Sequence, residues 1–153
     1  MIKINVITNN TNWLRYIKEP NNYLERKIKK INSKEKRFDK KSIFCTLLLS
    51  GNKEIKNLNK KFRNKNKSTD ILSFPHQTKK ELKKLLIFNS KIYLGDIIIN
   101  FRKINTSSEL LFKSHFNVLW IHGLVHLFGY DHKKDVSYKQ MQIIEKKFLR
   151  KIS

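Results

Sequence analysis

Three of the five histidines lie close together near the C-terminal end, at positions 122, 126 and 132. On a helix, residues four apart share one face, so His122 and His126 can reach a common zinc ion at about 2.0–2.1 Å. His132 can join them only if the helix ends first, and Gly129 is the residue type that most often takes the left-handed conformation at a helix end. An isolated histidine on an apolar helix is more often a core residue, but this spacing predicts one zinc ion held by all three.

The residue after the first histidine argues against peptide hydrolysis. The spacing His-x3-His-x2-Gly-x2-His is that of the metzincin proteases, in which a glutamate follows the first histidine and acts as general base. Here that position is Gly123, and the loss of a general base lowers a rate by about 10²–10⁴-fold. Three protein ligands still leave a fourth position open, as in catalytic zinc sites.

A basic, turn-rich segment at 63–69 supplies charge that fits a phosphodiester substrate. Arg63 heads this segment, and its planar guanidinium can bind two phosphate oxygens at once. We therefore expect Arg63 and His122 to be catalytic residues, although Arg63 alone would also fit a solvated surface charge. The expected RNA-binding residues are the following basic side chains: Lys60, Lys61, Arg63, Lys65 and Lys67.

The overall charge favours a polyanionic partner. The chain has 34 lysines and arginines against 12 acids, a net charge of +22, and a domain this basic attracts nucleic acid. An AT-rich genome would enrich lysine, asparagine and isoleucine, but it would not deplete acidic residues. A membrane surface is a weaker alternative, because no basic amphipathic segment stands apart from the fold.

Other compositional features exclude several classes. The single Cys45 excludes an intrachain disulfide and cysteine-based zinc sites, and its apolar neighbours predict a buried, inert thiol. Residues 2–8 alternate like a strand instead of forming a signal-peptide core, and the apolar stretch 116–128 is too short to cross a bilayer. We expect a cytoplasmic protein with no membrane partner and no small-molecule cofactor.

Hydrophobic periodicity predicts an α+β fold in which residues 1–153 form one domain. Apolar runs of strand length occupy 2–8, 42–49, 70–74 and 92–100, with Gly95 suggesting a bulge or a close backbone approach. Helices are expected near 23–31, at 53–62 with Asn52 as N-cap, around 81–86 and over 136–152. A capping box from Thr106 to Glu109 should start a long helix that is apolar nearly all round and ends after His126. The fold expected is a small mixed β-sheet packed with helices around this buried central helix.

Four segments resemble the YbeY endoribonucleases, bacterial zinc proteins of ribosomal RNA maturation. The first is the histidine motif His-Gly-Leu-Val-His-Leu-Phe-Gly-Tyr-Asp-His at 122–132. The others, in the same order as in that family, are Leu58-Asn59 with Phe62-Arg63, Thr69 to Pro75, and Leu94 to Ile97. The resemblance covers about residues 58–145, and position 118 departs from it, with valine where the family often has histidine.

The resemblance implies a specific activity. It points to a single-strand-specific, zinc-dependent endoribonuclease, a hydrolase of phosphodiester bonds, in 3′-end maturation of small-subunit ribosomal RNA and ribosome quality control. It implies that zinc is bound by His122, His126 and His132, that Arg63 is functionally important, and that ribosomal RNA, the ribosome and ribosomal proteins are the partners. The alternative is a non-catalytic ribosome-assembly factor that binds RNA and carries a structural zinc. A metalloprotease is disfavoured, because Met141 has the spacing of a helix core residue rather than that of a Met turn.

Overall fold

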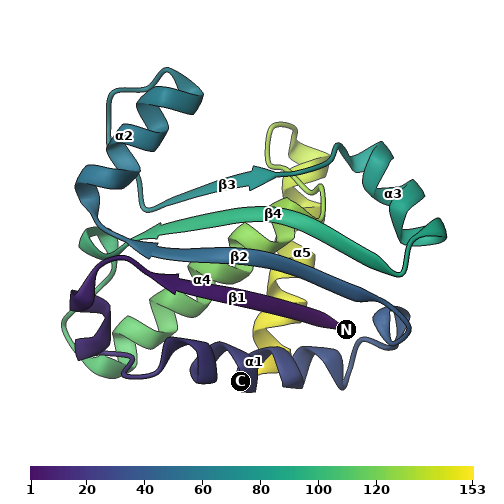
Figure 1. Cartoon of the computed structure of the whole chain (residues 1–153), viewed down its shortest axis with the longest axis horizontal. Coiled ribbons are helices and arrows are strands. Elements are labelled where there is room, and N and C mark those ends of the chain that lie inside the picture. The colour runs from purple at the N-terminus through teal and green to yellow at the C-terminus, as the bar shows by residue number, and fades with distance from the viewer.

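The computed structural model describes residues 1–153 and is built on one four-stranded mixed sheet (Figure 1). Its strands lie in the order β1-β2-β4-β3. The first three run parallel, whereas β3 pairs antiparallel with β4 at one edge. The strand bounds are β1 Ile2–Thr8, β2 Ser42–Ser50, β3 Ile71–Pro75 and β4 Lys91–Asn100. The α+β class and the four predicted strands are therefore confirmed.

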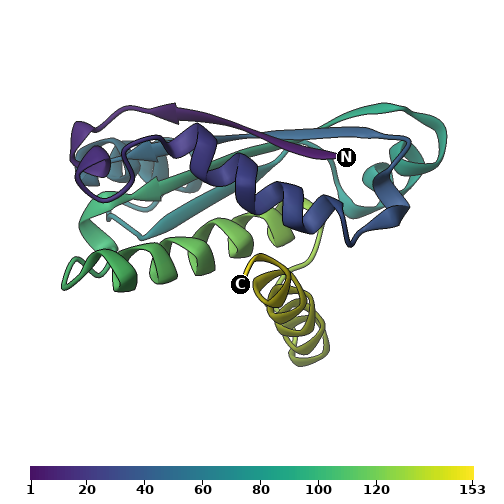
Figure 2. The ribbon, with the colours of Figure 1, turned by 90° about the horizontal axis from the view of Figure 1, so that it is seen from below.

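The helices form layers on one face of the sheet and cap one end of the other face. Figure 2 shows α4 and α1 beneath the sheet and α5 in a further layer below α4. The short α2 instead packs Ile55 against Leu72 and Ile98 on the opposite face. The helix bounds are α1 Pro20–Asn32, α2 Asn52–Arg63, α3 Lys79–Phe88, α4 Glu109–Leu127 and α5 Asp135–Ile152. Three short 3-10 turns lie at Thr11–Arg15, Lys36–Phe38 and Phe101–Lys103. None of the helices combines the length and apolar character needed to cross a bilayer.

The central helix α4 has the predicted core role, with exposed positions that the sequence did not indicate. Phe112, Phe116 and Trp120 are fully buried on it, and the first two surround the buried Trp13 ring edge-on. Leu110 and Val118, however, are 79% and 46% exposed. The helix therefore keeps one apolar face toward solvent while the rest of its surface forms the core.

Two predicted helix caps are wrong by one or two residues. The N-cap of α4 is Ser108, whose side chain accepts a hydrogen bond from the Leu111 amide, so the capping box beginning at Thr106 does not form. The N-cap of α2 is Gly51, and the Asn52 side chain instead accepts a hydrogen bond from Asn100 Nδ2 at 3.0 Å. The causes differ: at α4 neighbouring polar residues compete for the cap and Ser108 forms the hydrogen bond, whereas at α2 a contact with Asn100 engages the Asn52 side chain and a glycine takes the cap position.

Gly95 occupies the irregular point of β4 that the sequence predicted. The register between β2 and β4 shifts there, and Gly95 has φ +133°. A Cβ atom at this position would lie 2.1 Å from the Phe74 carbonyl oxygen of β3. Glycine is therefore required for β3 to pair with β4 at this point.

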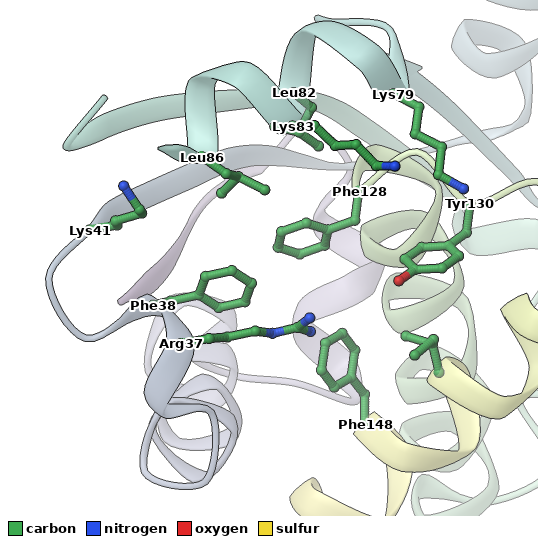
Figure 3. Close-up of a pocket in the computed structure, with 11 residues that line it drawn as sticks. Arg37, Phe38, Lys41, Lys79, Leu82, Lys83, Leu86, Phe128, Tyr130 and Phe148 are labelled. Atoms are coloured by element: carbon green, nitrogen blue, oxygen red, sulfur yellow. The ribbon is translucent and has the colours of Figure 1, made fainter. Parts of the chain in front are cut away.

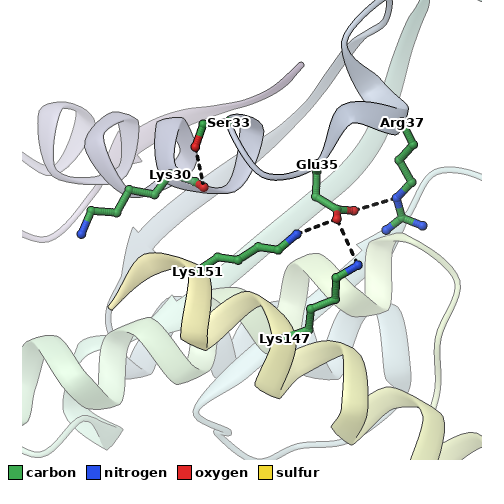
Figure 4. A network of polar contacts seen from close by, with 6 residues as sticks. All are labelled: Lys30, Ser33, Glu35, Arg37, Lys147 and Lys151. Atoms are coloured by element: carbon green, nitrogen blue, oxygen red, sulfur yellow. Dashed lines mark hydrogen bonds and ion pairs between the residues drawn. The ribbon is translucent and has the colours of Figure 1, made fainter.

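A buried carboxylate fastens α5 to the segment that follows α1 (Figure 4). Glu35, 6% exposed, receives Lys151 Nζ at 2.5 Å, Lys147 Nζ at 3.0 Å and Arg37 Nε at 2.8 Å. Burial alone would raise the pKa of Glu35, but the hydrogen bonds from Lys151 and Lys147 and the charge of Arg37 outweigh it and lower the pKa to about 2. Glu35 thus remains ionised at neutral pH and links two distant parts of the chain.

Substitution Glu35→Gln should lower the free energy of unfolding by about 3 kcal/mol at neutral pH. Because the folded pKa lies below the ordinary 4.5, this stabilisation is complete above that value and disappears as the pH falls toward about 2. Urea unfolding over a pH series should therefore show the two proteins converging in acid. The control Glu25→Gln removes an exposed carboxylate that pairs with Lys29, and should cost less than about 0.5 kcal/mol. Equal losses in both variants would contradict the role of Glu35.

Candidate metal centre

The three predicted histidines converge at the C-terminal end of α4. One ring nitrogen of each of His122, His126 and His132 lies within 4.8 Å of the others. His122 and His126 project from the last turns of α4, and Gly129, with φ +90°, ends the helix in the left-handed conformation. The Gly129 amide donates to the His126 carbonyl at 2.9 Å, and the turned chain brings His132 back to the other two rings.

Two oxygen acceptors orient the helical rings. His122 Nδ1 lies 2.6 Å from Glu145 Oε1 of α5, and His126 Nδ1 lies 2.9 Å from the Tyr130 carbonyl. In the neutral rings the hydrogen therefore belongs on Nδ1, which leaves the Nε2 lone pairs free. No sequence pattern selects Glu145, since it lies 23 residues from its partner on another helix.

The donor set fits a metal ion. The two Nε2 atoms are 3.1 Å apart, close to the separation of about 3.3 Å between two ligands of a tetrahedral zinc. Two lone pairs facing each other at this distance repel unless a cation lies between them. Burial, and then the charge of His122, lower the pKa of His126 to about 4, against an opposing effect of the Tyr130 hydrogen bond. His126 is thus neutral at physiological pH, as a metal ligand must be.

Gly123 lies where α4 packs directly against side chains of β3 and β4. A Cβ atom there would lie 2.7 Å from Ile97 Cγ2 and 3.1 Å from Ile71 Cδ1. A side chain at this position would therefore point into the packed sheet. The glutamate that metzincin proteases carry after the first histidine has no space here, which supports the prediction against peptide hydrolysis.

The histidines line a cleft of about 960 Å³ whose other wall is basic. Of the predicted RNA-binding residues, Arg63 and Lys65 line it, whereas Lys60, Lys61 and Lys67 do not. The prediction omitted three further lining residues, Lys79, Tyr130 and Lys133. Lys79 reaches the cleft from α3 only through the fold, whereas Tyr130 and Lys133 lie within two residues of His132 in the chain. The carboxylates that line the cleft are Asp70 and Asp131.

Arg63 is held at the cleft by backbone rather than by an acid. It is the last residue of α2, which Asn64 ends with φ +54°. Its Nη2 donates to the Ser73 carbonyl of β3 at 2.9 Å, and its guanidinium lies 5.6 Å from the centre of the Phe74 ring. Its charge is therefore positioned without being neutralised, and the remaining donors are free for an anion.

The buried Asn59 holds the basic segment in place. The side-chain Nδ2 of Asn59 donates to the Lys67 carbonyl at 2.8 Å, and the backbone carbonyl of Asn59 accepts from the Lys65 amide at 3.2 Å. The segment after Arg63 thus folds back on α2, which keeps Lys65 beside the cleft.

The fold and these side chains define an α+β protein with a candidate three-histidine metal site in a basic cleft. The family model described as "Endoribonuclease YbeY" matches residues 7–153. The chain is 44% identical over 146 residues to the endoribonuclease YbeY of Pelagibacter ubique (strain HTCC1062), covering 92% of this chain and 90% of that one. It is 32% identical over 134 residues to the endoribonuclease YbeY of Fusobacterium nucleatum, covering 84% and 79%. The chain therefore belongs to the endoribonuclease YbeY family.

A solved structure has a related fold. The solution structure of TM1509 from Thermotoga maritima superposes with a TM-score of 0.56 at 25% identity, covering 99% of this chain and 89% of that one. The family resemblance seen in the sequence is thus confirmed by the family match and by these relatives, and its α+β fold by the structure.

Replacing Glu145 should weaken metal binding without unfolding the protein. Loss of a carboxylate that orients a ligating histidine typically lowers metal affinity about 10- to 100-fold. Glu145→Ala should show such a loss in competition with a chromogenic zinc chelator, and Glu145→Gln, which keeps an oxygen acceptor, a smaller one. Glu109→Gln, at the opposite end of α4 and exposed, is the control. Wild-type affinity in both Glu145 variants would contradict the orienting role.

Proposed function

We propose that the protein is a zinc-dependent endoribonuclease that cleaves single-stranded RNA in 3′-end maturation of small-subunit ribosomal RNA and in ribosome quality control. The observation that carries this proposal is the convergence of three histidine nitrogens and Arg63 in one cleft. Membership of an endoribonuclease family supports RNA as the substrate. The proposed partners are ribosomal RNA, the ribosome and ribosomal proteins, which would place the protein in the cytoplasm.

The proposed role of the three histidines is to bind the metal ion. His122, His126 and His132 would hold one zinc ion, with Glu145 and the Tyr130 carbonyl fixing the ring orientations. The chemistry that zinc supplies in such sites is Lewis acidity, which polarises a phosphate oxygen and acidifies water. His122 would thus be catalytic through its bond to the ion.

Arg63 would stabilise the negative charge that develops on the phosphate in the transition state. Its hydrogen bond to the Ser73 carbonyl uses one donor, and the others remain free for an anion in the cleft. Lys65, Lys79 and Lys133 add positive charge along the cleft and would attract the RNA strand. Lys60, Lys61 and Lys67 remain proposed contacts for RNA that extends beyond the cleft.

A non-catalytic role in ribosome assembly is the second candidate. It is favoured by the position of His132 after the left-handed Gly129, because a metal ion there would fasten the end of α4 to the chain that follows. Protein that loses its fold when stripped of metal, and that never cleaves RNA after zinc is restored, would support this candidate over the nuclease.

The nuclease proposal predicts different rates for three variants on a labelled single-stranded RNA. His126→Ala and Arg63→Ala should each slow cleavage by about 100-fold or more, because they remove a zinc ligand and a transition-state contact. The control Lys56→Ala removes an exposed charge of α2 outside the cleft, and should stay within about twofold of wild type. A duplex of the same sequence should resist cleavage. Equal rates in all four proteins would identify a contaminating nuclease and overturn the proposal.

A further inference from the structure

A second hollow lies beside the histidine cleft and combines aromatic walls with a basic rim (Figure 3). Its volume is about 300 Å³, at the lower end of the range for small-molecule sites. Four aromatic rings line it, contributed by segments far apart in the sequence: Phe38, Phe128, Tyr130 and Phe148. We call this hollow the aromatic pocket.

Positive charge surrounds the aromatic pocket without any acid among its lining residues. Its cations are Arg37, Lys41, Lys79 and Lys83. Arg37 is partly neutralised by Glu35, but Lys83 of α3 is exposed and forms no ion pair. In Figure 3 the side chain of Lys83 extends from α3 along the rim of the hollow toward the side of Lys79. The pocket therefore favours a ligand that carries negative charge at its entrance.

Two of the aromatic rings, Phe128 and Tyr130, are only partly buried and can offer surface to such a ligand. Phe38 and Phe148, by contrast, are buried. Phe38 and Phe128 lie nearly parallel, with centroids 5.5 Å apart and planes inclined by 12°. This spacing leaves no room for a further ring between them. Because Phe38 is buried and the Arg37 guanidinium lies 4.7 Å from its centre, Phe128 is the ring of the pair that a flat ligand would stack on. Lys79 Nζ lies 5.2 Å from the centre of the Tyr130 ring, which places a cation of the rim beside an aromatic wall of the pocket.

The aromatic pocket adjoins the histidine cleft. Lys79 and Tyr130 line both hollows. Tyr130 also joins them chemically, since its carbonyl accepts from His126 Nδ1 while its ring borders the pocket. A strand whose phosphate lies among the histidines and Arg63 is thus within reach of the pocket through a neighbouring nucleotide.

We propose that the aromatic pocket is a subsite for one base of a single-stranded RNA bound in the histidine cleft. An apolar ligand would leave the rim cations unused, and a free phosphate would leave the aromatic walls unused. A nucleotide satisfies both, because its base stacks on the rings and its phosphate meets Lys79 and Lys83. This subsite rests on the proposed function, since it takes RNA as the strand in the cleft.

The contribution of the base is measured with two uncleavable single strands of equal length and charge. One is 2′-O-methyl oligouridine, and the other is the same sugar–phosphate chain without bases. The ratio of their affinities, measured at one physiological salt concentration, reports the contribution of the bases, because both strands make the same phosphate contacts. Leu86→Trp fills the pocket from α3, and it should reduce this ratio at least about fivefold, as expected for the loss of one stacked base. A thermal melt establishes that the variant is folded.

A matched pair of charge reversals tests the rim independently of packing. Lys83→Glu and Lys80→Glu make the same change in net charge at exposed positions of the same helix, α3. Only Lys83 lines the pocket. Lys83→Glu should weaken binding of oligouridine at least about threefold more than Lys80→Glu, and Lys83→Arg should restore it. Both positions are exposed, so these variants remain informative even if Leu86→Trp does not fold.

The outcomes separate the subsite from the nuclease activity. If Leu86→Trp keeps the wild-type affinity ratio and the two charge reversals bind alike, the subsite is wrong, whether or not RNA is cleaved. If both measurements respond as expected in a protein that fails to cleave RNA, the subsite stands and the proposed nuclease activity falls. Absence of any oligouridine binding by the wild-type protein overturns the subsite directly.

Discussion

The contact between α4 and the sheet at Gly123 sets the geometry of the whole site. The absence of a side chain lets the helix lie directly against Ile97 of β4 and Ile71 of β3. His122 precedes this contact and His126 lies one turn later, so the packing orients both rings toward the edge of the sheet. The same edge strand, β3, carries the Ser73 carbonyl that holds Arg63. The distance between the histidines and the arginine is therefore fixed by core packing rather than by a flexible loop.

Helix α5 connects this site to the first part of the chain. Glu145 contacts His122, while Lys147 and Lys151, two and six residues further along, contact Glu35. One rigid helix thus bears both the group that orients a histidine and the cations that anchor it to the segment after α1. Side-chain order at the histidines consequently depends on how well α5 is docked.

The sequence predicted those features that local patterns determine. Apolar runs located the strands, and the left-handed Gly129 and the irregularity at Gly95 followed from the chemistry of glycine. It failed where neighbouring polar residues compete for one cap, as at Thr106 and Ser108. Helical spacing also places Phe62 on the same face of α2 as the buried Ile55, yet Phe62 is 59% exposed, because α2 covers only one end of its sheet face. Glu145 and Lys79 were missed because their roles arise from long-range contacts that no spacing records, whereas Lys133 directly follows His132 and could have been selected from the motif.

The local arrangement of charge matters more than the net charge of +22. Helix α3 contains one acid, Glu81, and its carboxylate accepts hydrogen bonds from the amide and hydroxyl of Thr78 in a capping box. This acid is therefore directed at the helix start and does not pair with Lys79 or Lys83. The cap that begins α3 thus leaves two uncompensated cations, one bordering the cleft and both bordering the aromatic pocket. A residue that serves helix formation in this way also determines the electrostatic potential beside the site.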